Sequence, residues 1–264
     1  MNSEVTFSSI VRSEWIKYRT VRSSIVGIFL TFFLTIGLGV LVTVLIRAHW
    51  NSPSNGPAQR LTFDPVQTSL VGVIFAQFAV GVIGTLFITS EYSSASIRTT
   101  LAAVPNRVRL IAGKFVVLVA CTFVVGEVVS FLAFLIGQAI YSGVVPTASL
   151  SNGTVLRAVI FSGVYLTLLA SLGFCIGLII RHSAASISVF VAMLLVLPLI
   201  IAFLPQSWQN DSIRFLPGEG LGHSMTSVQP GSHLFAPWTS LGILVLYVVV
   251  LLAISTTLFR RRDA

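Results

Sequence analysis

Few residues of this chain could act as metal ligands or nucleophiles, and they are scattered. Two of the four histidines, His223 and His233, share one polar segment, and they could hold a metal ion only with further ligands. Histidines in such a segment are more often solvated, so we expect no metal site. Cys121 and Cys175 both stand in apolar runs, where cysteine acts as a small buried hydrophobe rather than as half of a disulfide.

The sequence also lacks the motifs of nucleotide and hydrolytic chemistry. A phosphate-binding loop requires Gly-x-x-x-x-Gly-Lys-[Ser/Thr], but Gly113-Lys114 is followed by Phe115 and has no glycine at the required upstream position. The His-Glu-x-x-His zinc motif and the Gly-x-Ser-x-Gly nucleophile motif do not occur either. We therefore expect no catalytic residues and no cofactor in this chain, which by itself is not expected to be an enzyme.

Glu127 is an acidic residue deep inside an apolar run. It follows Lys114 by 13 positions, which is about 20 Å along a helix. An ionised carboxylate near the centre of a bilayer costs roughly 2.5–3.5 kcal/mol, so such a residue should face the bundle interior or a wet cavity. Glu127 is then either a cation-contacting or proton-linked group on a transport path, or a structural carboxyl that bonds to a neighbouring helix.

In the structural case, the expected partners of Glu127 are groups such as Gln77, Thr85 and Ser171. Pro198 predicts a kink or an unwound segment in another apolar run, and kinked helices often line pathways. The candidate pathway residues are therefore Glu127, Gln77 and Pro198.

The composition shows which elements must position these residues. Only 9% of the residues are charged, against about 25% in a typical soluble domain, and 55% are hydrophobic. This excludes a soluble enzyme, a disordered chain and a nucleic-acid-binding domain. A membrane-spanning helix needs about 20 mostly apolar residues. We predict an all-α polytopic membrane protein, a single transmembrane domain over 1–264, with six spans near 24–46, 67–89, 115–141, 155–180, 183–204 and 239–259.

The lysines and arginines predict the orientation of these spans. If the N-terminus is cytoplasmic, 12 of the 16 basic residues fall on the cytoplasmic side and 4 on the other. Because basic residues favour cytoplasmic loops, we expect both termini in the cytoplasm. The first apolar run is longer than the core of a signal peptide and no small-residue cleavage site follows it, so we expect an uncleaved span.

Residues 6–22 predict an amphipathic helix that lies in the cytoplasmic interface. Apolar residues recur at spacings of three and four, and aromatic side chains of this kind belong at headgroup depth. Docking on another protein face is the alternative. Glu14 falls on the apolar side, so it needs a partner or water. The expected interfacial anchors are Trp15, Tyr18, Arg19 and Arg22.

The segment between the second and third spans carries the most informative pattern. Ile97, Leu101 and Val104 predict a short amphipathic helix, which Pro105 ends, and basic residues lead into the next span. Such a helix on the cytoplasmic face could dock into a groove of a soluble partner. The alternative is a basic cytoplasmic loop without a partner.

This segment resembles the permease subunits of ABC-2 type ABC transporters, most of which are bacterial exporters. Their recurrent loop reads approximately Glu-[Tyr/Phe]-x-x-Gly-Thr-Ile-Arg-x-x-Leu-x-x-x-Pro-x-Arg, with a lysine shortly after. Ala95 and Ser96 stand where the family usually has glycine and threonine. The matching residues are Glu91, Tyr92, Ile97, Arg98, Leu101, Pro105, Arg107 and Lys114.

The resemblance implies the membrane subunit of an ATP-driven exporter in a bacterial plasma membrane. Its partners would be membrane lipids, a second copy or a homologous permease, and two separate ATPase subunits that bind ATP and Mg, but no nucleic acid. Residues 91–104 would form the coupling helix on the ATPase. Residues 205–238 would form short helices at the outer mouth. The second and fifth spans would line the substrate route, and the first and fifth would meet the other protomer.

The cargo expected of such an exporter is an amphipathic drug, lipid or peptide. Two other classes of function remain open from the sequence. One is an ATP-independent carrier or channel, and the other is a membrane sensor without transport.

Overall fold

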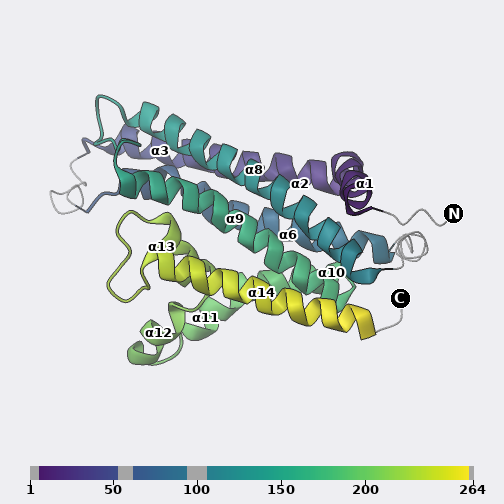
Figure 1. Ribbon diagram of the computed structural model, residues 1–264. Coiled ribbons are helices and arrows are strands. Elements are labelled where there is room, and N and C mark those ends of the chain that lie inside the picture. Colours follow the sequence, from purple (N-terminus) through teal and green to yellow (C-terminus); the bar gives the residue numbers. More distant parts are fainter. Residues whose placement is uncertain (1–5, 53–61, 94–105, 262–264) are drawn as a thin grey trace.

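The computed structural model describes residues 6–52, 62–93 and 106–261, and this part of the chain is helical, without strands. Six of its helices are long and apolar enough to cross a membrane, as predicted. These are Arg22–His49, Gly72–Tyr92, Arg107–Tyr141, Gly153–Ile180, Ser183–Ile201 and Pro237–Arg261. The long helices run side by side, and the described chain begins and ends at the same end of the bundle (Figure 1).

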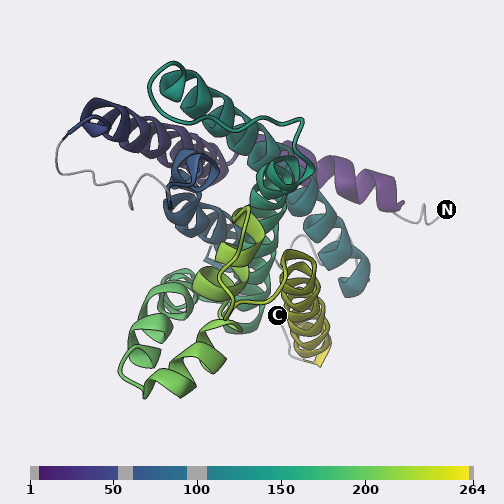
Figure 2. The same cartoon turned by 90° about the vertical axis from the view of Figure 1, so that its left-hand side faces the viewer.

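The N-terminal part contains a crosswise helix followed by the first span. Helix α1 covers Phe7–Thr20, slightly less than the predicted 6–22, and begins at a Thr6 side chain that accepts a hydrogen bond from the Ser9 backbone. Figures 1 and 2 show α1 set across the direction of the long helices. The first span consists of α2 (Arg22–Phe32), the π-helical segment η1 (Phe33–Gly37) and α3 (Leu38–His49).

The middle of the chain forms three spans and one short helix. Short helix α5 (Pro65–Ser69) precedes α6 (Gly72–Ser93), so the prediction that the second span begins at 67 is wrong. The Asp64 side chain caps the N-terminus of α5, and Pro65 occupies its first turn. These two residues make α5 begin as a helix separate from α6. The third and fourth spans are α8 (Arg107–Tyr141) and α9 (Gly153–Ile180), each capped by an asparagine.

The fifth span is interrupted and shorter than predicted. It consists of α10 (Ser183–Val191), the π-helical segment η2 (Ala192–Val196) and α11 (Leu197–Ile201), and so ends before the predicted residue 204. Pro198 is the second residue after η2. The regular α-helical hydrogen bonding is therefore interrupted close to the proline, which predicts a disturbance there.

The last segment carries short helices before the final span. They are α12 (Gln206–Ile213), the π-helical segment η3 (Pro217–Gly222) and α13 (His223–Thr226), and α14 (Pro237–Arg261) follows. Helices α12 and α13 lie at the end of the bundle opposite α1 (Figure 1). The two ends of the bundle therefore carry different structures.

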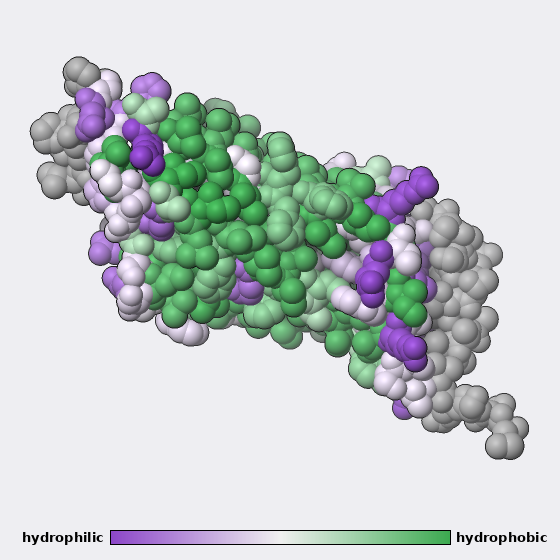
Figure 3. Space-filling view, turned by 90° about the horizontal axis from the view of Figure 1, so that it is seen from above, coloured by the Kyte–Doolittle hydropathy of each residue, from purple (hydrophilic) through white to green (hydrophobic). Residues whose placement is uncertain are grey.

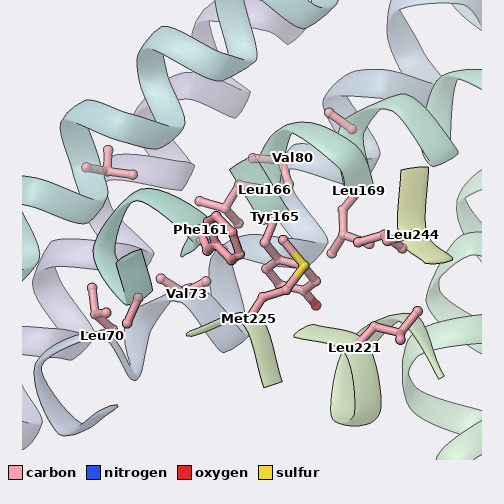
Figure 4. Packing of buried hydrophobic residues seen from close by; sticks show 14 of the residues in the cluster. Leu70, Val73, Val80, Phe161, Tyr165, Leu166, Leu169, Leu221, Met225 and Leu244 are labelled. Atoms are coloured by element: carbon pink, nitrogen blue, oxygen red, sulfur yellow. The ribbon is translucent and has the colours of Figure 1, made fainter. Parts of the chain in front are cut away.

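Helix α9 is the centre of the bundle. In its apolar window 78% of the residues are buried, against 17% in the first span and 17% in the last. Figure 4 shows Tyr165, Leu166 and Leu169 of α9 packed among side chains from other elements, including Val80 and Leu244. On the outer surface a broad apolar region separates two hydrophilic ends (Figure 3), which is the distribution that a membrane-spanning protein requires.

Glycines allow α9 to approach α6 closely. A Cβ atom on Gly173 would lie 2.3 Å from the backbone oxygen of Gly81, and one on Gly84 would lie 1.9 Å from that of Ala170. Both distances are far below van der Waals contact, so only glycine fits. Gly173 and Gly177, four positions apart on α9, form a small-xxx-small pattern that serves helix packing.

Replacing Gly84 by alanine should separate α6 from α9. We expect G84A to lower the stability of the purified protein by about 1–3 kcal/mol, because overpacking shifts backbone atoms at this contact. The matched control is G242A in α14, where a Cβ atom meets nothing within 4 Å. Thermal unfolding in detergent measures both variants, and equal midpoints would contradict the close contact.

Candidate functional site

Four charged side chains form a cluster inside the bundle at the end that carries α1. The ammonium of Lys114 lies 2.7 Å from Oε2 of Glu14 and 2.6 Å from Oε1 of Glu91. The ammonium of Lys17 lies 3.1 Å from Oε1 of Glu14 and 2.9 Å from Oε1 of Glu91. Two positive and two negative charges therefore share one site, which we call the charge cluster.

Three helices contribute to the charge cluster. Glu14 lies on the buried face of α1, where Ile10 and Tyr18, four positions away on either side, are also buried. Glu91 lies in the last turn of α6, and Lys114 lies in the third turn of α8. Because α6 and α8 flank the segment 94–105, the cluster connects both sides of that segment to α1.

Pairing makes the burial of Lys114 tolerable. Its side chain is 1% exposed, and an unpaired ammonium there would carry a desolvation penalty of about several kcal/mol. The Phe87 ring centroid, 5.5 Å from Nζ, offers a further favourable contact for the cation. The Lys17 side chain is 40% exposed, so its ion pairs are more screened and contribute less.

The pKa of Lys17 lies above its ordinary value. Burial alone lowers this pKa, but hydrogen bonds and attraction from Glu91 and Glu14 outweigh the effect of burial. A lysine whose pKa is raised by folding stabilises the protein at every pH below its unfolded pKa, and loses that contribution only as the pH rises through the folded value. Lys17 is therefore charged in the cluster at neutral pH.

Most of this cluster cannot be recognised in the sequence. The position of Lys114 predicts a basic residue on the cytoplasmic side, but its side chain is buried among helices. The expectation that Glu14 needs a partner is confirmed, and the partner is Lys114, 100 positions away. An acidic residue on an apolar helix face was the one available signal, and it does not identify the distant lysine.

The expected interfacial anchors divide into two groups. Trp15 is exposed, and the Arg19 guanidinium lies 5.7 Å from its ring centroid. Arg22 is also exposed at the start of α2. The prediction that Tyr18 is an interfacial anchor is wrong, because this side chain is 3% exposed and packs edge-on against Phe87 inside the bundle.

Part of the expected coupling motif lies within the described residues. Glu91 belongs to the charge cluster. The guanidinium of Arg181 lies over the Tyr92 ring, 5.4 Å from the ring centroid. Arg107 donates to the backbone oxygen of Phe259 over 3.1 Å and so fastens the start of α8 to the end of α14. The remaining motif residues, Ile97, Arg98, Leu101 and Pro105, lie outside the described residues, as does most of the predicted helix 91–104.

A cavity of about 540 Å³ lies towards the other end of the bundle, between α6, α9, η2 and the η3–α13 segment. Most of its lining is apolar, with a few polar groups. Tyr165 donates a hydrogen bond to Oε1 of Gln77 on the inner wall. Gln67 Nε2 lies 3.4 Å from Nδ1 of His223. An apolar cavity with a few polar groups is typical of small-molecule sites.

The pKa of His223 at this cavity lies below its ordinary value. Burial lowers its pKa, and repulsion from His233 lowers it further, while Asp64 and Glu219 act in the opposite direction. A neutral imidazole both donates and accepts hydrogen bonds. Within the described residues, no group of three or more His, Cys, Asp or Glu side chains gathers in one place.

The three expected pathway residues do not share one site. Gln77 lines the cavity. Pro198 is buried and does not line it, although Leu194 and Leu195 of the preceding η2 segment do. Glu127 lies against α9, where a Cβ atom on Gly163 would meet its carboxyl carbon at 2.6 Å, and it does not line the cavity either.

The expected hydrogen-bond partners of Glu127 are engaged elsewhere. Its Oε1 atom is buried and has no hydrogen-bond partner among the described residues. Gln77 accepts from Tyr165, Thr85 donates to the Gly81 backbone over 2.8 Å, and Ser171 donates to the Thr167 backbone over 2.9 Å. In the described part of the chain, Glu127 Oε1 therefore forms none of the three hydrogen bonds named for the structural alternative.

The fold and the two sites define an all-helical protein with six candidate membrane spans, a buried charge cluster at one end and a cavity towards the other. Residues 28–264 match the family described as "Protein of unknown function (DUF2705)", and the chain belongs to this family. No curated protein matches the chain.

Removing the central lysine should destabilise the protein far more than removing the outer one. K114M removes the buried cation and leaves Glu14 and Glu91 paired with the partly exposed Lys17 alone, so we expect a loss of about 3–5 kcal/mol. K17M is the matched control and should cost about 1 kcal/mol or less, because Lys17 is partly solvated. Thermal or denaturant unfolding compares the two. A K114M protein as stable as K17M would show that the cluster does not bind these helices together.

Proposed function

We propose that this chain is the membrane subunit of an ATP-driven exporter of the ABC-2 type. In this proposal it works as a dimer and couples to two separate ATPase subunits. The observation that carries the proposal is the charge cluster, in which Lys114 joins Glu14 of α1 to Glu91 at the end of α6. The segment whose sequence resembles an ABC-2 coupling loop begins at Glu91 of this cluster and leads into α8, which carries Lys114.

The cluster offers a physical route for coupling. Segment 94–105 connects α6 to α8. The Lys114–Glu14 pair at 2.7 Å ties α8 to α1, and the Lys17–Glu91 pair at 2.9 Å ties α6 to α1. A push on this segment from a closing ATPase pair would therefore move α1, α6 and α8 together. Packed elements of this kind transmit displacement as rigid bodies and can switch between two arrangements.

The cavity supports a substrate route between the second and fifth spans. Its wall includes Gln77 from α6 and Leu194 from η2, which belong to the two spans that the resemblance assigns to the route. Apolar walls with a few hydrogen-bonding groups suit an amphipathic drug, lipid or peptide. The cavity lies in the half of the bundle remote from the charge cluster, so an outward-opening dimer would release cargo there.

The distribution of basic residues supports the orientation of this exporter. The charge cluster and both termini face the cytoplasm of a bacterial cell, and α12 and α13 face outward, because 12 of the 16 lysines and arginines then lie on the inner side. Helix α1 then lies in the inner interface. An ATPase encoded separately provides the phosphate-binding loop that this chain lacks.

Affinity purification of the tagged chain from its native membrane tests the partnership. We expect an ATPase with a phosphate-binding loop to be recovered with the wild-type chain. It should be lost with R98E/L101E, because R98E reverses a charge of the proposed docking helix and L101E puts a charge in place of an apolar residue. R109E is the matched control, since Arg109 is exposed on α8 but stands outside the motif. A wild-type chain that never recovers an ATPase would instead favour an ATP-independent carrier or a membrane sensor.

Cysteine labelling tests the substrate route. In a C121A/C175A background, we expect Q77C to react faster with a membrane-impermeant maleimide when the purified complex is trapped with ATP and vanadate, because the cavity opens outward. S207C on exposed α12 is the control and should react equally in both states. If Q77C reacts at the same rate with and without trapped nucleotide, this cavity is not part of the substrate route.

A further inference from the structure

A second, more apolar groove lies at the α1 end of the bundle. It has a volume of about 460 Å³ and runs between α1, α2 and α8. Its wall includes Ile25 and Phe29 of α2, and Ala120 and Val124 of α8. The groove is open because the first span packs loosely against the rest of the bundle. Only 17% of the residues in its most apolar stretch are buried.

The groove lies within the depth of one membrane leaflet. It begins beside Arg19 on the crosswise helix α1, and its lining on α8 extends from Ala120 to Val125, about 8 Å along the helix. Val125 is 11 positions, or about 16 Å, beyond the buried charge of Lys114. One leaflet contributes about 15 Å of the roughly 30 Å hydrocarbon core. The apolar part of the groove therefore lies in the layer that a lipid acyl chain occupies.

The charge at the mouth of the groove selects the headgroup. Arg19 is the one charged residue of the lining, and its guanidinium lies over the Trp15 ring. In the described parts of the chain no acidic side chain forms an ion pair with Arg19 or Arg22. An exposed guanidinium beside an apolar groove fits a lipid phosphate, which it can bind through two hydrogen bonds.

A neighbouring groove repeats this arrangement on the other side of α2. It has a volume of about 430 Å³ and is lined by apolar residues of α2 and α6, such as Leu30 and Val82. Its one charged lining residue is Arg22, which again stands at the α1 end of the span. Both grooves therefore have an arginine at the α1 end and an apolar interior that extends along the membrane normal. This shared arrangement favours a lipid over a protein surface as the occupant.

We propose that the groove between α1, α2 and α8 binds an acyl chain of an anionic glycerophospholipid, whose phosphate pairs with Arg19. Bound lipid fills the space between the loosely packed first span and α8. It also covers the exposed apolar side chains Phe29 and Val124. The site requires a membrane but does not depend on transport or on an ATPase.

Quenching of Trp15 fluorescence tests the site in the full chain. With Trp50, Trp208 and Trp238 replaced by phenylalanine, Trp15 reports contact with lipids whose acyl chains carry bromine. Two kinds of nanodisc are compared, one with brominated phosphatidylglycerol in phosphatidylcholine and one with the bromine on the phosphatidylcholine. We expect about a fivefold preference for the anionic lipid, as one arginine near an anionic surface provides.

Two pairs of matched variants separate a site from general attraction. R19Q should abolish the preference, whereas R12Q, which removes an equal charge from the exposed side of α1, should retain it. A120F should fill the groove and reduce quenching by both lipids, whereas A139F, the same change at an exposed position of α8 outside the groove, should not. Equal effects of R19Q and R12Q would overturn the proposal.

Native mass spectrometry of the wild-type chain tests the same site without the tryptophan replacements. We expect phosphatidylglycerol to stay bound to the wild-type and R12Q proteins and to be lost from R19Q. If neither lipid stays bound and A120F splits a dimer that A139F leaves intact, a second copy of the chain covers the groove. That result would also overturn the proposal.

Discussion

The structure at the α1 end depends on one requirement, which is that the buried ammonium of Lys114 be surrounded by negative charge. Its partners come from two directions, Glu14 on the crosswise helix and Glu91 at the end of α6. Neither carboxylate could be buried in the same place without a cation. The positions of α1, α6 and α8 are therefore mutually determined, and displacement of any one of them exposes or unpairs a charge.

Hydroxyl side chains elsewhere in the spans show how polar groups are accommodated without such pairing. Thr31, Thr35, Thr85 and Ser162 each donate to the backbone oxygen four residues earlier in their own helix. These bonds satisfy the hydroxyl without a partner on another helix. Other polar side chains do bond between helices outside the two sites. Gln138 of α8 donates to Ser69 of α5 over 3.0 Å, and Ser183 of α10 donates to Thr89 of α6 over 2.9 Å. Within the described residues, the ion pairs that join different helices all belong to the charge cluster.

The spans could be predicted from the sequence because length and apolarity are properties of a continuous segment. An amphipathic helix near the N-terminus followed from the spacing of apolar residues, whereas the short helices before the last span were implied only by the family resemblance. The charge cluster could not be predicted, because Lys114 and Glu14 are 100 positions apart and no local pattern pairs them. Tyr18 was misplaced for the same reason, since an aromatic residue on an amphipathic helix suits an interface and a protein core equally well. The cavity joins Gln77 to Tyr165 and His223, and only the packing of α6 against α9 brings them together.

The central position of α9 has a consequence for the order in which the chain assembles during synthesis. Helix α9 is the fourth span, so the bundle core cannot close until the ribosome has passed Ile180. Glu14, Glu91 and Lys114 all emerge earlier, with the first three spans. The charge cluster is thus a tertiary contact that a three-span intermediate can form before the core exists, and it would hold that intermediate together while the central helix is made.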